Sequence, residues 1–80
     1  MKLLNVKNVD KFFEIVDSCT DKVELVSKDG DRINLKSKLA QYFALAKVFS
    51  NEEIVKELEL VTYNVEDKAK FIKFMYNGNQ

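Results

Sequence analysis

The chain has 80 residues, 46% of them hydrophobic and 32% charged, which is typical of one small globular domain covering residues 1–80. Thirteen basic side chains balance thirteen acidic ones, so net charge provides no attraction to nucleic acid or an anionic membrane, and we expect neither as a partner. One cysteine excludes an internal disulfide, and no apolar run approaches the about 20 residues of a membrane span. We therefore expect a soluble cytoplasmic protein.

The first predicted elements are a short strand at residues 2–6 and a helix that begins after Asn8. Asparagine is a preferred N-cap, and an acidic residue, Asp10, follows in the first turn, where the helix dipole favours it. The helix is expected to end between residues 18 and 21. Its apolar side chains recur at helical spacing and form one stripe: Val9, Phe12, Phe13, Val16 and Cys19.

Two alternating segments, residues 22–25 and 32–36, predict a β-hairpin. In both, apolar residues alternate with charged or polar ones, so each strand has one apolar face. The Asp29-Gly30 pair between the segments tolerates the positive backbone angles of a tight turn. The apolar side chains share one face: Val23, Leu25, Ile33 and Leu35.

Ser37 follows the hairpin and is expected to cap a second helix. The apolar positions of this helix are Leu39, Tyr42, Phe43, Ala46 and Phe49. Three of them, Tyr42, Phe43 and Phe49, are expected to lie in the core rather than to bind a cofactor. Residues 50–53 have the spacing of a capping box but also fit a loop, so a turn or one short helical turn is expected there.

Alternation over residues 57–63 predicts a further strand, with Leu58, Leu60 and Thr62 inward. A last helix is expected to begin after Asn64 and to stop at Asn77-Gly78. Its predicted stripe consists of Val65, Ala69, Ile72, Met75 and Tyr76, flanked by Phe71 and Phe74. The element order is thus β-α-β-β-α-β-α, and the polar outer faces of the later strands predict an α+β fold with the helices on one face of the sheet.

With this order of elements, the chain resembles the HPr family, the small histidine-containing phosphocarrier proteins of the bacterial sugar phosphotransferase system. The resemblance spans nearly the whole length. It is most specific where Val23-Glu24-Leu25, a tight turn and Ile33-Asn34-Leu35-Lys36-Ser37 lead into a helix. It implies an open-faced β-sandwich, in which a four-stranded antiparallel sheet is covered by three helices on one face.

The chain departs from HPr at the position of the phosphate-accepting group. HPr proteins begin their first helix with a Gly-x-His-Ala-Arg-Pro box, whose histidine accepts phosphate at the helix N-terminus. The corresponding stretch here is Asn5-Val6-Lys7-Asn8-Val9, and the chain has no histidine. Asparagine and lysine offer no equivalent nucleophilic nitrogen near neutral pH. We therefore expect no phosphocarrier activity, no enzyme and no catalytic residue.

The resemblance implies a binding or regulatory module linked to the sugar phosphotransferase system, with enzymes or regulators of that system as protein partners. The alternative is a structural or oligomerising domain that reuses the fold without a link to sugar transport. Because a three-helix layer cannot hide every large apolar side chain, some are expected to stay exposed, one or two among Phe12, Tyr42, Phe71 and Phe74. The expected partner-binding surface consists of Lys36, Lys38, Leu39, Tyr42 and Phe12.

Ser37 matches the position that a dedicated kinase phosphorylates in many HPr proteins, and a phosphate at a helix start is electrostatically favourable. The simpler interpretation is that Ser37 only caps the helix. Lys38 and Ala40 depart from the family pattern around this serine, and both interpretations stay open. We expect no cofactor and no metal, because Asp29-Gly30-Asp31 has the spacing of a hairpin and not of a calcium loop.

Overall fold

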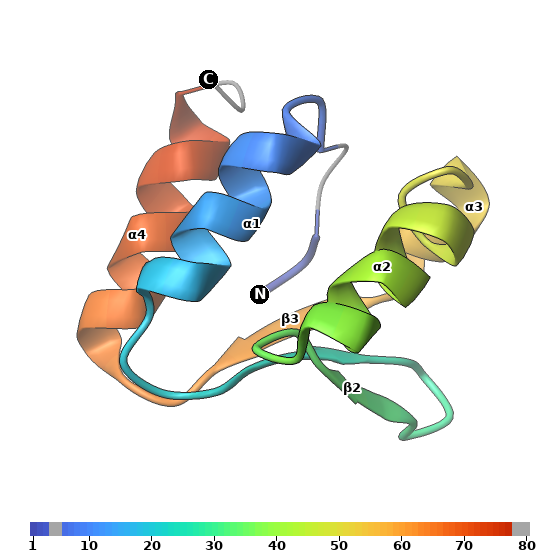
Figure 1. Cartoon of the computed structure of the whole chain (residues 1–80), viewed down its shortest axis with the longest axis horizontal. Helices are drawn as coiled ribbons and strands as arrows, with labels where there is room; N and C mark the ends of the chain where they lie inside the picture. The colour runs from blue at the N-terminus through green and yellow to red at the C-terminus, as the bar shows by residue number, and fades with distance from the viewer. Residues whose placement is uncertain (4–5, 78–80) are drawn as a thin grey trace.

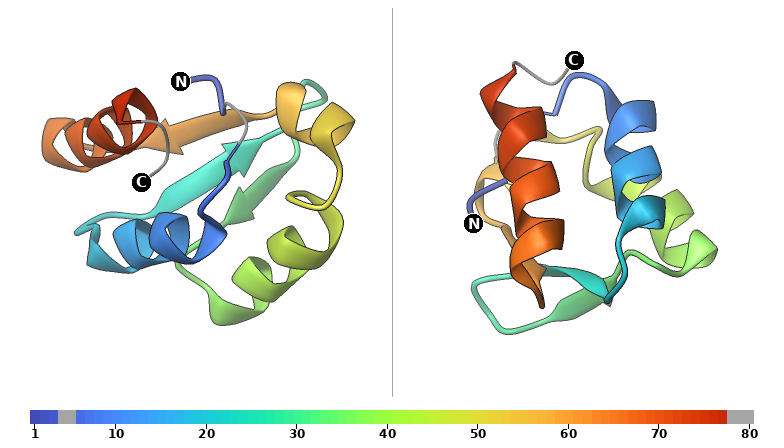
Figure 2. Two further views of the ribbon diagram at one scale, coloured as in Figure 1. Left: turned by 90° about the horizontal axis from the view of Figure 1, so that it is seen from above. Right: turned by 90° about the vertical axis from the view of Figure 1, so that its left-hand side faces the viewer.

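The computed structural model describes residues 1–3 and 6–77. Its helices are α1 (Val9–Ser18), α2 (Lys38–Lys47), α3 (Glu52–Lys56) and α4 (Val65–Tyr76). Its strands are β1 (Val23–Val26), β2 (Arg32–Asn34) and β3 (Glu59–Thr62), which form an antiparallel sheet in the order β2-β1-β3. The helices gather on one side of this sheet (Figures 1 and 2). The predicted α+β class is confirmed.

The predicted four-stranded sheet is not confirmed, because the described residues form three strands. In place of the expected strand at residues 2–6 there is one antiparallel bridge between Lys2 and Glu59. Met1 supports it, since its carbonyl oxygen accepts the N–H of Leu60 at 2.7 Å. Pairing at a single point makes a bridge and not a strand. Residues 4 and 5 of the predicted strand lie outside the described residues.

The described residues form four helices where three were predicted, because the segment expected as a turn or one short helical turn leads into the short helix α3. Its cap is Asn51, whose side-chain oxygen accepts the N–H groups of Glu53 and Ile54 at 3.0 and 3.4 Å. Ser50, the expected first residue of a capping box, instead donates its hydroxyl to the carbonyl of Ala46 at 2.7 Å. The serine side chain thus satisfies a carbonyl in the last turn of α2, and the cap of α3 is its neighbour Asn51.

Three predicted N-caps are confirmed. The side-chain oxygens of Asn8, Ser37 and Asn64 each accept a backbone N–H three residues later, at 3.0, 3.4 and 2.7 Å. Each contact satisfies a donor that the first helical turn leaves unpaired. These caps fix where α1, α2 and α4 begin.

The predicted hairpin is also confirmed. Leu25 of β1 pairs with Ile33 of β2 on one edge and with Leu60 of β3 on the other. Gly30 turns the chain with a φ of 89°, a backbone angle that side-chain-bearing residues rarely adopt. Because β1 is the central strand, its inward side chains lie in the middle of the apolar face.

The core fills the space between the sheet and the helices. Leu25, Leu35 and Leu60 cover the inner face of the sheet, and each is at most 2% exposed. Phe12 of α1 packs above them, with four aromatic rings centred within 6.2 Å of its own: Phe13, Phe49, Phe71 and Phe74. This aromatic cluster joins α1, α4 and the segment after α2 into one core.

The predicted inward stripes of α2 and α4 are wrong. On α2 the buried residues are Gln41 and Ala44, whereas four positions of the predicted apolar stripe are exposed: Leu39, Tyr42, Phe43 and Ala46. Two of these, Tyr42 and Phe43, were expected in the core. On α4 the buried residues are Asp67, Phe71 and Phe74, whereas the exposed ones are Val65, Ala69, Ile72 and Tyr76. Each helix has apolar residues on two sides, and contacts elsewhere in the fold decide which side is buried.

Candidate functional site

Helix α2 carries large apolar side chains on its solvent side. Leu39 is 81% exposed, Tyr42 69% and Phe43 53%, and Ala46 is exposed as well. Their spacing of three, one and three residues places them on one ridge about 10 Å long. A surface helix normally presents polar side chains to water. These four residues, called the α2 ridge below, therefore form the candidate site.

Polar contacts on the inner side of α2 fix its rotation. Gln41 is only 7% exposed, and its amide nitrogen donates to the carbonyl of Leu35 at 2.9 Å and to a carboxylate oxygen of Asp17 at 2.8 Å. A buried amide needs such partners, since leaving it unpaired costs free energy. With Gln41 and Ala44 held toward the core, the opposite side of α2 faces solvent.

Lysines stand at both ends of the α2 ridge. Lys38 is the first residue of α2 and Lys47 the last, and both are exposed. The ammonium group of Lys38 lies 2.7 Å from a carboxylate oxygen of Asp17. Hydrogen bonds from Lys38 and then from Gln41 lower the pKa of Asp17, so this carboxylate stays ionised and offsets part of the charge of Lys38. The candidate site is thus apolar along its length and basic at its ends.

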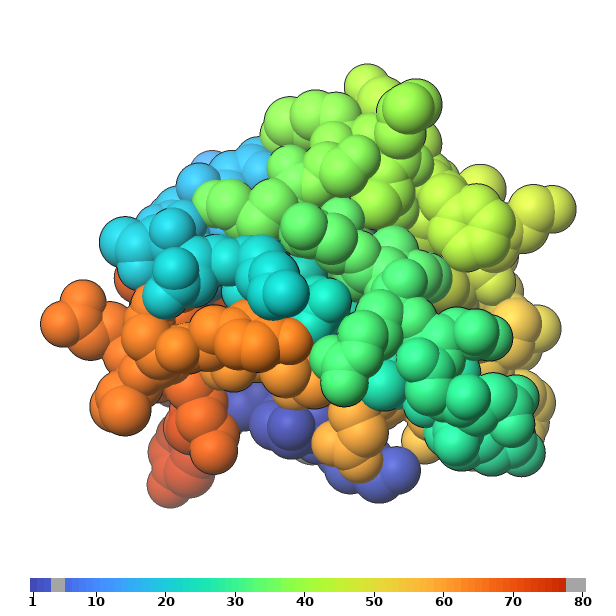
Figure 3. Space-filling view, turned by 90° about the horizontal axis from the view of Figure 1, so that it is seen from below, coloured from blue at the N-terminus to red at the C-terminus, as the bar shows by residue number. Residues whose placement is uncertain are grey.

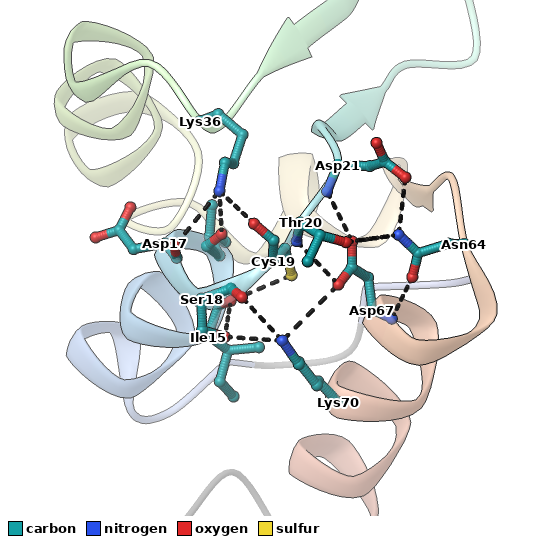
Figure 4. Close-up of polar contacts among 11 residues, drawn as sticks. Ile15, Asp17, Ser18, Cys19, Thr20, Asp21, Lys36, Asn64, Asp67 and Lys70 are labelled. Carbon is teal, nitrogen blue, oxygen red and sulfur yellow. Dashed lines mark hydrogen bonds and ion pairs between the residues drawn. The ribbon is translucent and has the colours of Figure 1, made fainter.

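Lys36, predicted for the partner surface, has a structural contact. Its ammonium group donates to the carbonyl oxygens of Val16, Asp17 and Cys19 at 3.3, 3.4 and 2.6 Å (Figure 4). These carbonyls belong to the end of α1, where the helix dipole favours a cation. Lys36 therefore caps the C-terminus of α1 by donating hydrogen bonds to carbonyl groups at its end.

Ser37 is exposed and accepts the N–H of Ala40, as its capping role predicts. It lies one residue before the lysine end of the α2 ridge. The regulatory interpretation of Ser37 stays a prediction.

Phe12 was predicted for the partner surface, and this prediction is wrong. Its side chain is 0% exposed and forms the centre of the aromatic cluster. The expectation that one or two of four large apolar residues stay exposed is met by Tyr42 alone, since Phe71 and Phe74 are buried like Phe12. Of the predicted surface, Lys38, Leu39 and Tyr42 lie together on α2.

A second polar cluster surrounds Asp67, which is buried at the start of α4 (Figure 4). Its carboxylate accepts the N–H groups of Thr20 and Asp21 at 3.2 and 3.1 Å and the side-chain amide of Asn64 at 2.9 Å. Burial alone would raise the pKa of Asp67, but these donors and Lys70 outweigh it, so the pKa is lowered. The cluster attaches α4 to the segment after α1, and every partner comes from the chain itself.

Cys19 lies beside this cluster and is 5% exposed. Burial raises the pKa of its thiol, which donates to the carbonyl of Ile15 at 3.2 Å. A buried, protonated thiol is a poor nucleophile. Among residues 1–3 and 6–77, no three of the histidine, cysteine, aspartate and glutamate side chains come together as metal ligands.

The outer face of the sheet has a polar cluster of its own, on the side shown from below in Figure 3. Glu24 is 6% exposed and accepts hydrogen bonds from Arg32, at 3.1 Å, and from the hydroxyl of Tyr63. The bond from Tyr63 lowers the pKa of Glu24 and raises the pKa of Tyr63. Lys22 lies 4.8 Å above the Tyr63 ring. These contacts join the strands across the sheet and leave the carboxylate well satisfied.

Sequence analysis missed several residues of the site. Phe43 was expected in the core and Ala46 was named only as an apolar position, although both continue the ridge that Leu39 and Tyr42 begin. The only signal for their exposure was a second apolar side on the same helix. Asp67 was not expected to form part of a polar cluster, although its position three residues after Asn64 is that of a capping pair.

No helix in the described part of the chain has the length and apolar character needed to cross a membrane. The HPr resemblance rests on the sequence motif alone. No protein-family model, no curated protein and no solved structure matches the chain.

Proposed function

We propose that this protein is a protein-binding module whose α2 ridge receives a short amphipathic helix of a partner protein. The single observation that carries the proposal is the reversed polarity of α2. The large apolar side chains of the ridge, Leu39, Tyr42 and Phe43, face water together with Leu45, while Gln41 faces the core. The proposal does not depend on the HPr resemblance, and a partner from the sugar phosphotransferase system stays a prediction of that resemblance.

The size of the α2 ridge fits a helical segment. From the exposed fractions and the area of aromatic side chains, its apolar surface is on the order of 400 Å². The largest apolar patch on a typical monomer measures about 300–600 Å² and is often functional. Two turns of a partner helix with apolar residues three and four apart would cover a ridge about 10 Å long.

The lysines at the two ends of the α2 ridge indicate which kind of helix can bind there. If α2 packed antiparallel on α2 of a second copy, Leu39 would face Ala46, and Lys38 would then face Lys47. Parallel packing would place each lysine beside its own counterpart. Both arrangements oppose like charges, whereas a partner helix with acidic residues flanking its apolar stripe would complement them. We therefore assign the ridge to an acidic amphipathic helix.

A display library of 18-residue amphipathic helical peptides with variable flanking charges tests the proposal, with the complete chain as bait. We expect enrichment of peptides with apolar residues at helical spacing and acidic flanks. Their binding should weaken at least tenfold on Leu39→Glu and should persist on Val65→Glu, a matched change at another exposed apolar position. Enriched peptides that bind the Leu39→Glu variant as well as the parent would overturn the proposal, as would the absence of any acidic helical binder.

A further inference from the structure

We infer that α4 mediates an antiparallel, two-fold symmetric dimer of this protein. The solvent side of α4 carries four apolar residues at spacings of four, three and four: Val65, Ala69, Ile72 and Tyr76. Val65 is 83% exposed, Ile72 48% and Tyr76 89%. This spacing is that of a helix-pairing seam. The four residues are called the α4 seam below, and the inference is independent of the α2 ridge.

The α4 seam is complementary to itself. When two copies of α4 run antiparallel about an axis between residues 70 and 71, Val65 lies opposite Tyr76 of the second copy. Ala69 then lies opposite Ile72 of the second copy. Each contact joins a smaller side chain to a larger one, which lets the two rows interdigitate. Because the arrangement is isologous, one short helix provides both halves of the interface.

Charged residues beside the seam favour the antiparallel direction. Glu66 and Lys73 lie on one flank, seven residues apart, and neither forms an ion pair within residues 1–3 and 6–77. Antiparallel pairing brings Glu66 of each copy near Lys73 of the other, so two opposite-charge contacts form. Parallel pairing would instead bring Lys68 of one copy near Lys73 of the other. The charges thus select a second copy in the antiparallel direction.

A hollow beside the seam provides additional apolar surface. It has a volume of ≈ 370 Å³ and is lined by Met1, Lys2, Ile72, Met75 and Tyr76. In the antiparallel pair, Val65 of the second copy lies opposite Tyr76, whose side chain lines this hollow. Seam and hollow rim together offer on the order of 600 Å² per copy, about 1,200 Å² in total, which is the lower limit for specific interfaces. We therefore expect a dimer that dissociates in the micromolar range.

The rest of the fold is compatible with this dimer. In the right-hand view of Figure 2 α4 faces the viewer, and no other described helix or strand passes in front of it. Figure 1 places α2 on the far side of the molecule from α4. Both α2 ridges would remain accessible in the dimer.

Sedimentation equilibrium of the complete chain from 10 to 500 μM tests the inference, with circular dichroism to verify that each variant is folded. The parent should change from its monomer mass of 9.3 kDa toward twice that value. Ala69→Glu places a charge in the centre of the seam and should keep the protein monomeric throughout. Leu39→Glu on α2 is the matched control and should dimerise like the parent.

A charge exchange tests the direction of the helices. Lys73→Glu alone should weaken the dimer about tenfold, since each of two contacts between opposite charges becomes a contact between like charges. Combining it with Glu66→Lys should restore the parent affinity. A parent that stays monomeric at 500 μM, a dimer that tolerates Ala69→Glu, or a double variant that is not restored would each overturn the inference.

Discussion

Replacing Gln41 by leucine tests how α2 is held in the fold. The side chain is 7% exposed and makes two hydrogen bonds, one to the buried carbonyl of Leu35 and one to the ionised Asp17. The substitution removes both donors and leaves the carbonyl unpaired. A lost hydrogen bond to a buried group costs about 1–3 kcal/mol, but Asp17 regains water because it lies at the surface. We therefore expect a loss of about 2 kcal/mol.

A loss of this size is easily measured. For a domain of this length, about 2 kcal/mol lowers the melting temperature by roughly 8–16 °C. Thermal and urea unfolding followed by circular dichroism would report it. Leu39→Gln is the matched control, and its stability should stay within about 0.5 kcal/mol of the parent, because that position faces water. A neutral Gln41→Leu together with a strongly destabilising Leu39→Gln would refute the rotation of α2 described above.

Three further predictions concern stability. Phe12→Ala should cost about 3–5 kcal/mol in urea unfolding, because its ring is fully buried among four others, and a cost below about 1 kcal/mol would contradict its place in the core. Ser37→Ala should cost about 1 kcal/mol through the lost cap, and Ser37→Asp, which also caps, should retain the stability of the parent. Because the pKa of Asp67 is lower in the folded protein than in the unfolded chain, its ionised carboxylate raises the free energy of unfolding at pH values above the ordinary carboxyl pKa near 4. This contribution is lost as the pH falls through the pKa that Asp67 has in the folded protein. Acid unfolding of Asp67→Asn should therefore be less steep below pH about 4, and an unchanged acid profile would contradict the prediction.

The starts of α1, α2 and α4 and the turn of the hairpin could be predicted because their signals are local. Asn8, Ser37 and Asn64 cap helices through contacts within three residues, and Gly30 makes its turn through its own backbone. The hairpin pattern likewise depends only on alternation along the chain. Such features need no knowledge of distant contacts, and all of them are confirmed.

The rotation of α2 and α4 could not be predicted because each helix offers two apolar sides. On α4, the stripe through Ala69 and Ile72 competes with the side bearing Phe71 and Phe74. The two phenylalanines bury more apolar area, and the core around Phe12 accepts them. The spacing of apolar residues shows that a helix is amphipathic. It does not show which of two apolar sides buries the larger side chains in the core. For the same reason, Phe43 and Ala46 of the α2 ridge were not predicted as surface residues.

The predicted first strand is not confirmed for a different reason. Residues 2–6 include three apolar residues, and apolar character alone does not show how many residues find a pairing partner. Among the described residues of this segment, Lys2 pairs with Glu59 at one bridge. Leu3 is 2% exposed, so its apolar character agrees with a place in the core.

The central claim is that α2 presents its apolar ridge to water, and solvent paramagnetic relaxation measured by NMR tests it most directly. With a soluble gadolinium chelate, dilute protein should show strong relaxation of the Leu39 methyl groups and the Tyr42 ring. The Ala44 methyl group and the Gln41 side-chain amide should be protected. Protected Leu39 and Tyr42 signals with a strongly relaxed Gln41 amide would contradict the claim.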